Sequence, residues 1–163
     1  MTKTHQLQIR VSAEDKARIR ARAAGAGMDV SKWVLQQALP PVEREFQALC
    51  RELASRPHAR SFTFAELQDW FNRLTGGELV RAVRHAPEAR LPPFEANYLA
   101  AIVEHAAAIK EVDPPRWTAT VEPLDTPWFA SSLKSLRLYL LTCSPPPFRR
   151  RNLFIDSSVG QRL

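Results

Sequence analysis

The chain has 163 residues, of which 45% are hydrophobic and 25% are charged. This composition is typical of a globular protein and excludes a disordered or fibrous one, and the length fits one ordinary domain or a small module joined to a larger one. The formal net charge of +6 favours a polyanion or an acidic protein as partner, although charge predicts association and not fold.

The N-terminal segment HQLQIRVSAED opens with alternating polar and apolar side chains. The polar positions are Gln6, Gln8 and Arg10, and the apolar positions are Leu7, Ile9 and Val11. This period of two predicts a β-strand with one solvated face and one buried face. A single strand leaves its backbone donors and acceptors unpaired, so this strand needs a partner.

Two short helices are predicted after the strand. Ser12 followed by Asp15 is similar to a capping box and predicts the start of the first helix. Either Gly25 or Gly27 provides the positive φ of a helix end, and Ser31 is a good N-cap for the second helix.

Residues 1–39 are too few to bury a core of their own. They carry seven Lys or Arg residues against three acidic residues, so most of the excess positive charge lies here. Two kinds of partner are open to the strand. It pairs with a later strand-like stretch, residues 118–121 or 153–156, or it pairs with the same strand of a second copy across a two-fold axis.

The order of strand, helix, turn and helix over residues 5–39 resembles the ribbon-helix-helix family of DNA-binding proteins. The matching stretches are QLQIRV, SAEDKARI and GMDVSKWV. The resemblance implies a homodimer in which two strands form an antiparallel ribbon that enters the major groove of double-stranded DNA. It further implies that an operator sequence is read by the outward side chains of the ribbon, which are Gln6, Gln8 and Arg10.

The chemistry of these side chains suits DNA recognition. Glutamine binds adenine through N6 and N7, and arginine binds guanine through O6 and N7. Because the second helix is predicted to begin at Ser31, its free backbone N–H groups and Lys32 are expected to contact a phosphate. Alternating residues also occur in any edge strand, so the prediction depends on the complete order of elements.

Residues 42–163 are predicted to form a helical, bundle-like module with a short strand-like C-terminal tail, so the fold class is mainly α. Apolar residues at helical spacing predict helices over VEREFQALCRELASR, PPFEANYLAAIVEHAAAIKEV and SSLKSLRLYLLTC. Another helix is predicted to begin at Thr63, because Thr63 and Glu66 have capping-box spacing. The two strand-like stretches are TATV and LFID.

The sequence does not predict an enzyme. It contains no glycine-rich phosphate loop, no H-E-x-x-H and no G-x-S-x-G motif. Cys50 and Cys143 have no Cys or His at metal-ligand spacing, so we expect no metal, no disulfide and no cofactor. No segment approaches the roughly 20 apolar residues of a membrane span and no signal-peptide pattern is present, so we expect a cytoplasmic protein.

The C-terminal segment predicts a protein partner. The stretch PWFASSLKSLRLYLLTCSPPPFRRRNLFIDSSVG is similar to proteins encoded beside abortive-infection-type nucleotidyltransferase toxins. This resemblance implies an antitoxin that represses its own operon and neutralises such a toxin. Arginine suits the carboxylates and phosphates of a nucleotidyltransferase pocket, so the expected toxin-binding residues are Phe148, Arg149, Arg150, Arg151 and Phe154.

Two alternatives to the antitoxin remain open. The first is an accessory protein of plasmid mobilisation, since such proteins use the same N-terminal fold at a transfer origin. The second is a structural or scaffold protein that pairs its first strand with LFID inside one chain and does not bind DNA.

Overall fold

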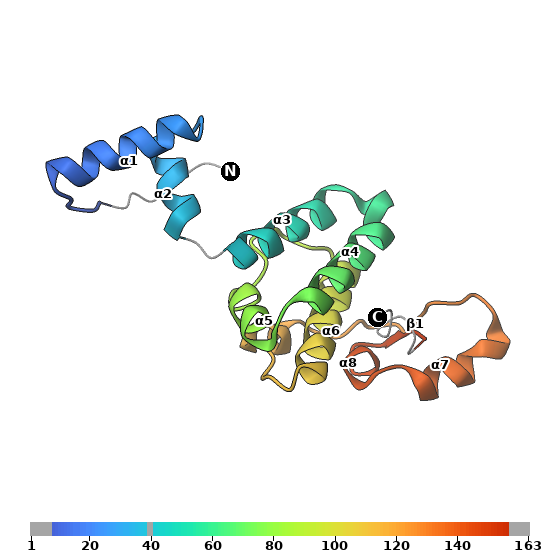
Figure 1. Ribbon diagram of the computed structural model, residues 1–163. Helices are drawn as coiled ribbons and strands as arrows, with labels where there is room; N and C mark the ends of the chain where they lie inside the picture. The colour runs from blue at the N-terminus through green and yellow to red at the C-terminus, as the bar shows by residue number, and fades with distance from the viewer. Residues whose placement is uncertain (1–7, 39–40, 157–163) are drawn as a thin grey trace. The chain divides into compact units, whose positions relative to one another are not determined.

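The structure is a computed structural model that describes residues 8–38 and 41–156. The chain divides into two compact units, residues 1–40 and residues 41–163 (Figure 1). We call them unit 1 and unit 2 and describe each by itself. The described chain is mainly helical, as predicted.

Unit 1 contains the helices α1, Ala13–Gly25, and α2, Val30–Ala38, which pack against each other. The predicted cap of α1 is present, because the backbone N–H of Asp15 donates to the Ser12 hydroxyl oxygen at 3.0 Å. Gly27 has φ of 63° and turns the chain between the helices. The predicted strand is not seen in residues 8–11, which have no regular structure, and residues 5–7 lie outside the described residues.

The start of α2 corrects one prediction. Asp29 and not Ser31 caps this helix, since the backbone N–H of Lys32 donates to the Asp29 carboxylate at 2.9 Å. Aspartate is as good an N-cap as serine, and it precedes Val30, where the helix begins. Ser31 therefore lies inside the first turn.

Unit 2 is built around one long buried helix, α6, Pro93–Ile109. The helices that pack on α6 are α4, Arg60–Arg73, α5, Gly76–Ala82, and α8, Pro146–Arg149, while α3, Pro41–Ser55, packs on α4 and α5. Short 3-10 helices connect these elements at Pro57–Ala59 (η1) and Arg116–Thr120 (η2). The largest fully buried side chains include Phe46, Phe71, Leu67, Leu99, Val103 and Phe148.

The capping box predicted at Thr63 and Glu66 does not form, and another pair of residues in unit 2 forms one instead. α4 already begins at Arg60, so Thr63 lies inside the helix, where its buried hydroxyl donates to the Ala59 carbonyl oxygen at 3.5 Å. The capping box that forms is at Thr75 and Glu78, at the start of α5.

The two strand-like stretches have different outcomes. LFID contributes strand β2, Leu153–Phe154, which pairs in parallel with β1, Trp128–Phe129. TATV lies instead in the 3-10 helix η2 and its short continuation, so the prediction of a strand there is wrong. The pairing of LFID with the first strand, as the scaffold alternative requires, is not seen in the described residues, because β2 pairs with β1.

The remaining part of unit 2 leads from β1 back to the core. A 3-10 helix, η3, Lys134–Leu136, continues into α7, Arg137–Cys143, and α8 then returns the chain to α6. In the part of the chain that the structure describes, no helix is long and apolar enough to cross a bilayer.

Candidate nucleic-acid interface

The residues that the sequence predicts to read bases precede α1. Gln8 and Arg10 are exposed, and Gln6 lies outside the described residues. Between and after them, Ile9 is 61% exposed and Val11 is 46% exposed. The described members of the alternating pattern, residues 8–11, therefore all contact solvent in the single chain.

The two helices of unit 1 leave further apolar side chains uncovered. Ala23 is the single fully buried residue among the described residues of this unit. Val30 and Leu35 of α2 are exposed, and Trp33 and Val34 are half-buried. So little burial is not enough to stabilise an independent unit of this size, and a second apolar surface is required.

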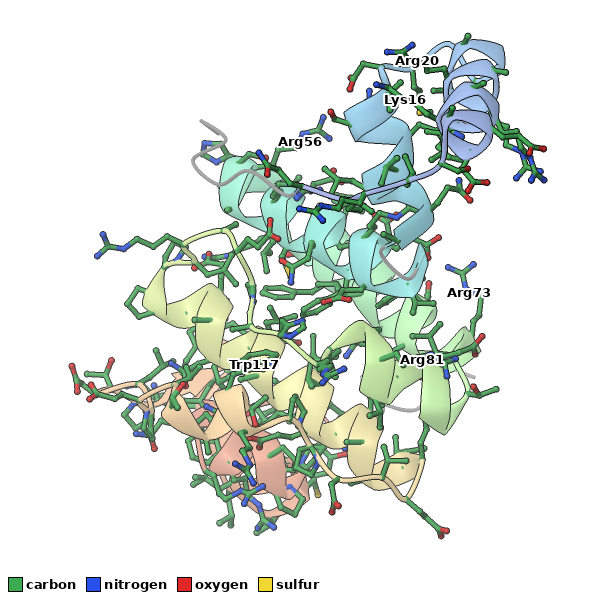
Figure 2. All side chains as sticks on the ribbon, turned by 90° about the vertical axis from the view of Figure 1, so that its left-hand side faces the viewer. Lys16, Arg20, Arg56, Arg73, Arg81 and Trp117 are labelled. Atoms are coloured by element: carbon green, nitrogen blue, oxygen red, sulfur yellow. The ribbon has the colours of Figure 1, made fainter. Side chains whose placement is uncertain are left out.

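Positive charge lies along α1. Lys16 and Arg20 are one turn apart, and Figure 2 shows both on the same side of the helix. Arg18 lies 3.9 Å from the Asp15 carboxylate, but both side chains are exposed, so this ion pair contributes little to stability. Exposed cations along a helix suit the regularly spaced phosphates of DNA. The residues predicted from the sequence to contact DNA did not include Lys16 and Arg20, although their spacing of four residues places them on one face of a helix.

The first turn of α2 is less open to an anion than the sequence predicts. The Asp29 carboxylate accepts the backbone N–H of Lys32, so that donor is already used. Ser31 and Lys32 remain exposed. The Lys32 ammonium group and the Ser31 hydroxyl are therefore the groups of this turn that are available to a phosphate, together with the positive end of the helix dipole.

The residues expected to bind a toxin lie in unit 2, and three of them are internal. Phe148 is fully buried, with its ring centroid 5.4 Å from that of Tyr98. Phe154 is buried in β2, where its ring stacks on Phe129 at 4.9 Å. Arg149 and Arg150 are exposed, and Arg150 lies 3.3 Å from the carboxylate of Glu104.

Arg151 is held by acceptors of its own chain. Its guanidinium group donates to the Glu104 carboxylate at 2.6 Å and to the carbonyl oxygens of Thr118 at 2.7 Å and Val121 at 3.2 Å. The prediction that Phe148, Arg151 and Phe154 face a partner does not fit this placement, because the folded unit already surrounds these side chains. Pro146 and Pro147, which precede these residues in sequence, lie in the first turn of α8.

Metal-ligating side chains do not cluster in the described structure. Among residues 8–38 and 41–156, no three His, Cys, Asp or Glu side chains are placed to hold a metal ion. Burial raises the pKa of the Cys50 thiol to about 12, so this thiol is protonated and a poor nucleophile at neutral pH.

Comparison with known proteins identifies one similarity. Residues 1–55 match the NikA-like family, described as mobilization protein NikA. The matching region spans unit 1 and continues to the end of α3. No curated protein and no solved structure matches the chain.

Proposed function

We propose that this chain is a DNA-binding accessory protein of plasmid mobilisation, and that unit 1 binds DNA as a two-fold dimer. The observation that carries the proposal is the match of residues 1–55 to the NikA-like mobilization family. This region contains the alternating segment, the basic face of α1 and the first turn of α2. On this proposal the protein acts by binding and not as an enzyme.

Dimerisation is supported by the apolar side chains that unit 1 leaves in solvent. Ile9 and Val11 precede α1, and Val30 and Leu35 lie on α2, all at least 40% exposed. If the segments before α1 of two copies pair in an antiparallel ribbon, their backbone groups are satisfied and Ile9 and Val11 face the helices. The ribbon contact thus pairs the free backbone groups and also covers the exposed apolar side chains.

DNA contact is supported by the side chains on the opposite face of that ribbon. Gln8 and Arg10 alternate with the apolar residues, so in a ribbon they project toward the major groove, where they match adenine and guanine. Lys16, Arg20 and Lys32 are suited to the flanking phosphates, which position the protein without reading sequence.

Mobilisation is preferred to an antitoxin because no observation favours a toxin partner. Three of the five side chains expected to bind the toxin are buried in unit 2, and the family match concerns mobilization proteins. A genetic experiment separates the two functions. Deleting the gene from the element that carries it lowers the transfer of that element to recipient cells if the protein serves mobilisation, whereas loss of an antitoxin arrests the host.

The first prediction tests the DNA-reading residues. Duplexes are selected from a random pool by the full chain, and the affinity of variants is measured by fluorescence anisotropy. Arg10→Ala costs about 1–3 kcal/mol on the selected sequence and relaxes preference at one base pair. Lys16→Ala weakens binding to all duplexes and lowers the salt slope by about 1, because one phosphate contact is lost.

Arg73→Ala is the matched control, since Arg73 is an exposed arginine of unit 2 at the end of α4 (Figure 2). It is expected to bind like the wild type. If Arg10→Ala retains the affinity and base preference of the wild type, the segment before α1 does not read DNA.

A further inference from the structure

Unit 2 exposes an apolar segment that we call the arm, residues 131–143. Every residue from 132 to 139 is exposed, and Figure 1 shows η3 and α7 on a loop that extends away from α3, α4 and α5. The exposed fractions are 59% for Leu133, 74% for Leu138, 45% for Tyr139 and 41% for Leu141. Leu140 is the one buried residue of α7.

The apolar side chains of the arm lie on more than one side of α7. Leu138 and Leu140 are two positions apart, which places them roughly 200° apart around a helix axis. Leu140 faces the core, so Leu138 faces away from it. A helix that is apolar on all sides is normally enclosed by protein, whereas a membrane surface covers one face only. The arm therefore suits a protein groove.

Unit 2 also contains a groove with an aromatic lining that suits the apolar side chains of the arm. It lies between α4 and the start of α6, has a volume of about 390 Å³, and is lined by four aromatic side chains, Phe64, Phe94, Tyr98 and Trp128. This volume is within the range of sites that hold small ligands, roughly 300–1,000 Å³. The groove thus has room for several aliphatic side chains.

The charged groups of this groove leave it slightly acidic. The Arg60 guanidinium group lies 3.2 Å from the buried Glu95 carboxylate and 4.7 Å from the centre of the Phe94 ring, so both its charge and its flat face are engaged. Asp69 lines the groove as well and is exposed. An aromatic surface with an acidic rim favours an apolar segment that carries positive charge.

Acidic residues predominate in the first part of unit 2, which contains α4 and α6, and basic residues predominate in the last part, which contains the arm. Residues 41–125 contain thirteen acidic residues against ten Lys or Arg, whereas residues 126–163 contain one acidic residue against six Lys or Arg. The arm itself carries Lys134 and Arg137 and no acidic residue. Two arms side by side repel each other, while an arm against the α4–α6 surface of another copy is electrostatically favourable.

We propose that the arm of one copy docks in the aromatic groove of a second copy, and that the exchange is reciprocal across a two-fold axis. The leucines of the arm fill the groove, and Lys134 meets its acidic rim. This contact belongs to unit 2 and is independent of the ribbon contact proposed for unit 1. The protein then has two separate interfaces between its copies. The ribbon joins the two copies of unit 1 and binds DNA, and the contact between arm and groove joins the two copies of unit 2.

The test measures self-association by sedimentation equilibrium in a full chain that carries Ile9→Asp and Val11→Asp. These changes remove the ribbon contact, so the association that persists belongs to unit 2. Adding Leu138→Ser and Leu141→Ser weakens dimerisation by at least about tenfold, because two exposed apolar contacts are lost. Ala65→Trp, which fills the groove from the exposed face of α4, has an effect of similar size.

Phe62→Ser is the matched control, because Phe62 is an 81% exposed apolar residue of α4 that does not line the groove. It leaves dimerisation unchanged, and circular dichroism checks that every variant is folded. Mixing the arm variant with the groove variant partly restores dimers, since one intact arm then meets one intact groove. The proposal is overturned if the Ile9→Asp, Val11→Asp chain is a monomer at all concentrations, or if the arm variant weakens dimerisation and the groove variant does not.

Discussion

Arg151 illustrates why a residue type alone does not determine a role. In the sequence it is one of three consecutive arginines beside a proline run, a pattern that favours an exposed binding segment. In the structure it is 5% exposed and bound to Glu104, Thr118 and Val121, while its neighbours Arg149 and Arg150 contact solvent. The acceptors come from segments about 30 to 47 residues away in sequence, so no local pattern identifies them.

Replacing Arg151 is therefore expected to destabilise the fold. Arg151→Met leaves Glu104 with only the longer contact from Arg150 and removes the guanidinium donors from the carbonyl oxygens of Thr118 and Val121. Removing one partner of a buried ion pair costs about 3–5 kcal/mol, which urea unfolding measures directly. Arg149→Met is the control and stays within about 0.5 kcal/mol of the wild type, because Arg149 is exposed. Equal stability of the two variants contradicts the role assigned to Arg151.

At the scale of elements, the sequence predicts the helices better than their first residues. The Ser12 cap is confirmed, since the backbone N–H of Asp15 donates to the Ser12 hydroxyl oxygen. The predictions that helices start at Ser31 and Thr63 are wrong for one reason, because each helix begins earlier in the chain. Asp29 caps α2, and η1 leads directly into α4 at Arg60. Serine and threonine also occur inside helices, where the hydroxyl can donate to a carbonyl oxygen of the preceding turn, so a cap is recognised only by comparison with the other candidate caps nearby.

The capping box of α5 gives a prediction for a single element. The Thr75 hydroxyl and the Glu78 carboxylate each accept a backbone N–H of the other residue, and α5 positions the buried Leu79 and Ala82. Thr75→Ala is expected to cost about 0.5–2 kcal/mol in the free energy of unfolding. A loss much smaller than this range indicates that core packing alone fixes α5.

The same cap predicts a pH effect with a definite sign. Hydrogen bonds from the backbone and side chain of Thr75 hold the pKa of Glu78 below its usual 4.5. The stabilisation from ionised Glu78 is present above pH 4.5 and is lost as the pH falls through the lowered pKa. Glu78→Gln therefore destabilises the protein near neutral pH, and its unfolding profile approaches that of the wild type in acid.

At the scale of the whole molecule, the sequence predicts the helical class and the long buried helix α6, whose apolar pattern is continuous. It does not predict the aromatic groove or the parallel pair of short strands, because both join segments that lie far apart in the chain. The ribbon remains a prediction, since its second strand belongs to another copy. A pattern within one chain shows which groups lack a partner and not which molecule supplies it.

The most direct test of the central claim is the mass of the complex between the full chain and its selected duplex, measured by analytical ultracentrifugation. To exclude association through unit 2, the measurement uses the Leu138→Ser, Leu141→Ser variant. The account predicts two chains on each duplex and two half-sites related by two-fold symmetry in the selected sequences. A complex with one chain, or selected sequences without such symmetry, would show that unit 1 does not bind DNA as a two-fold ribbon dimer.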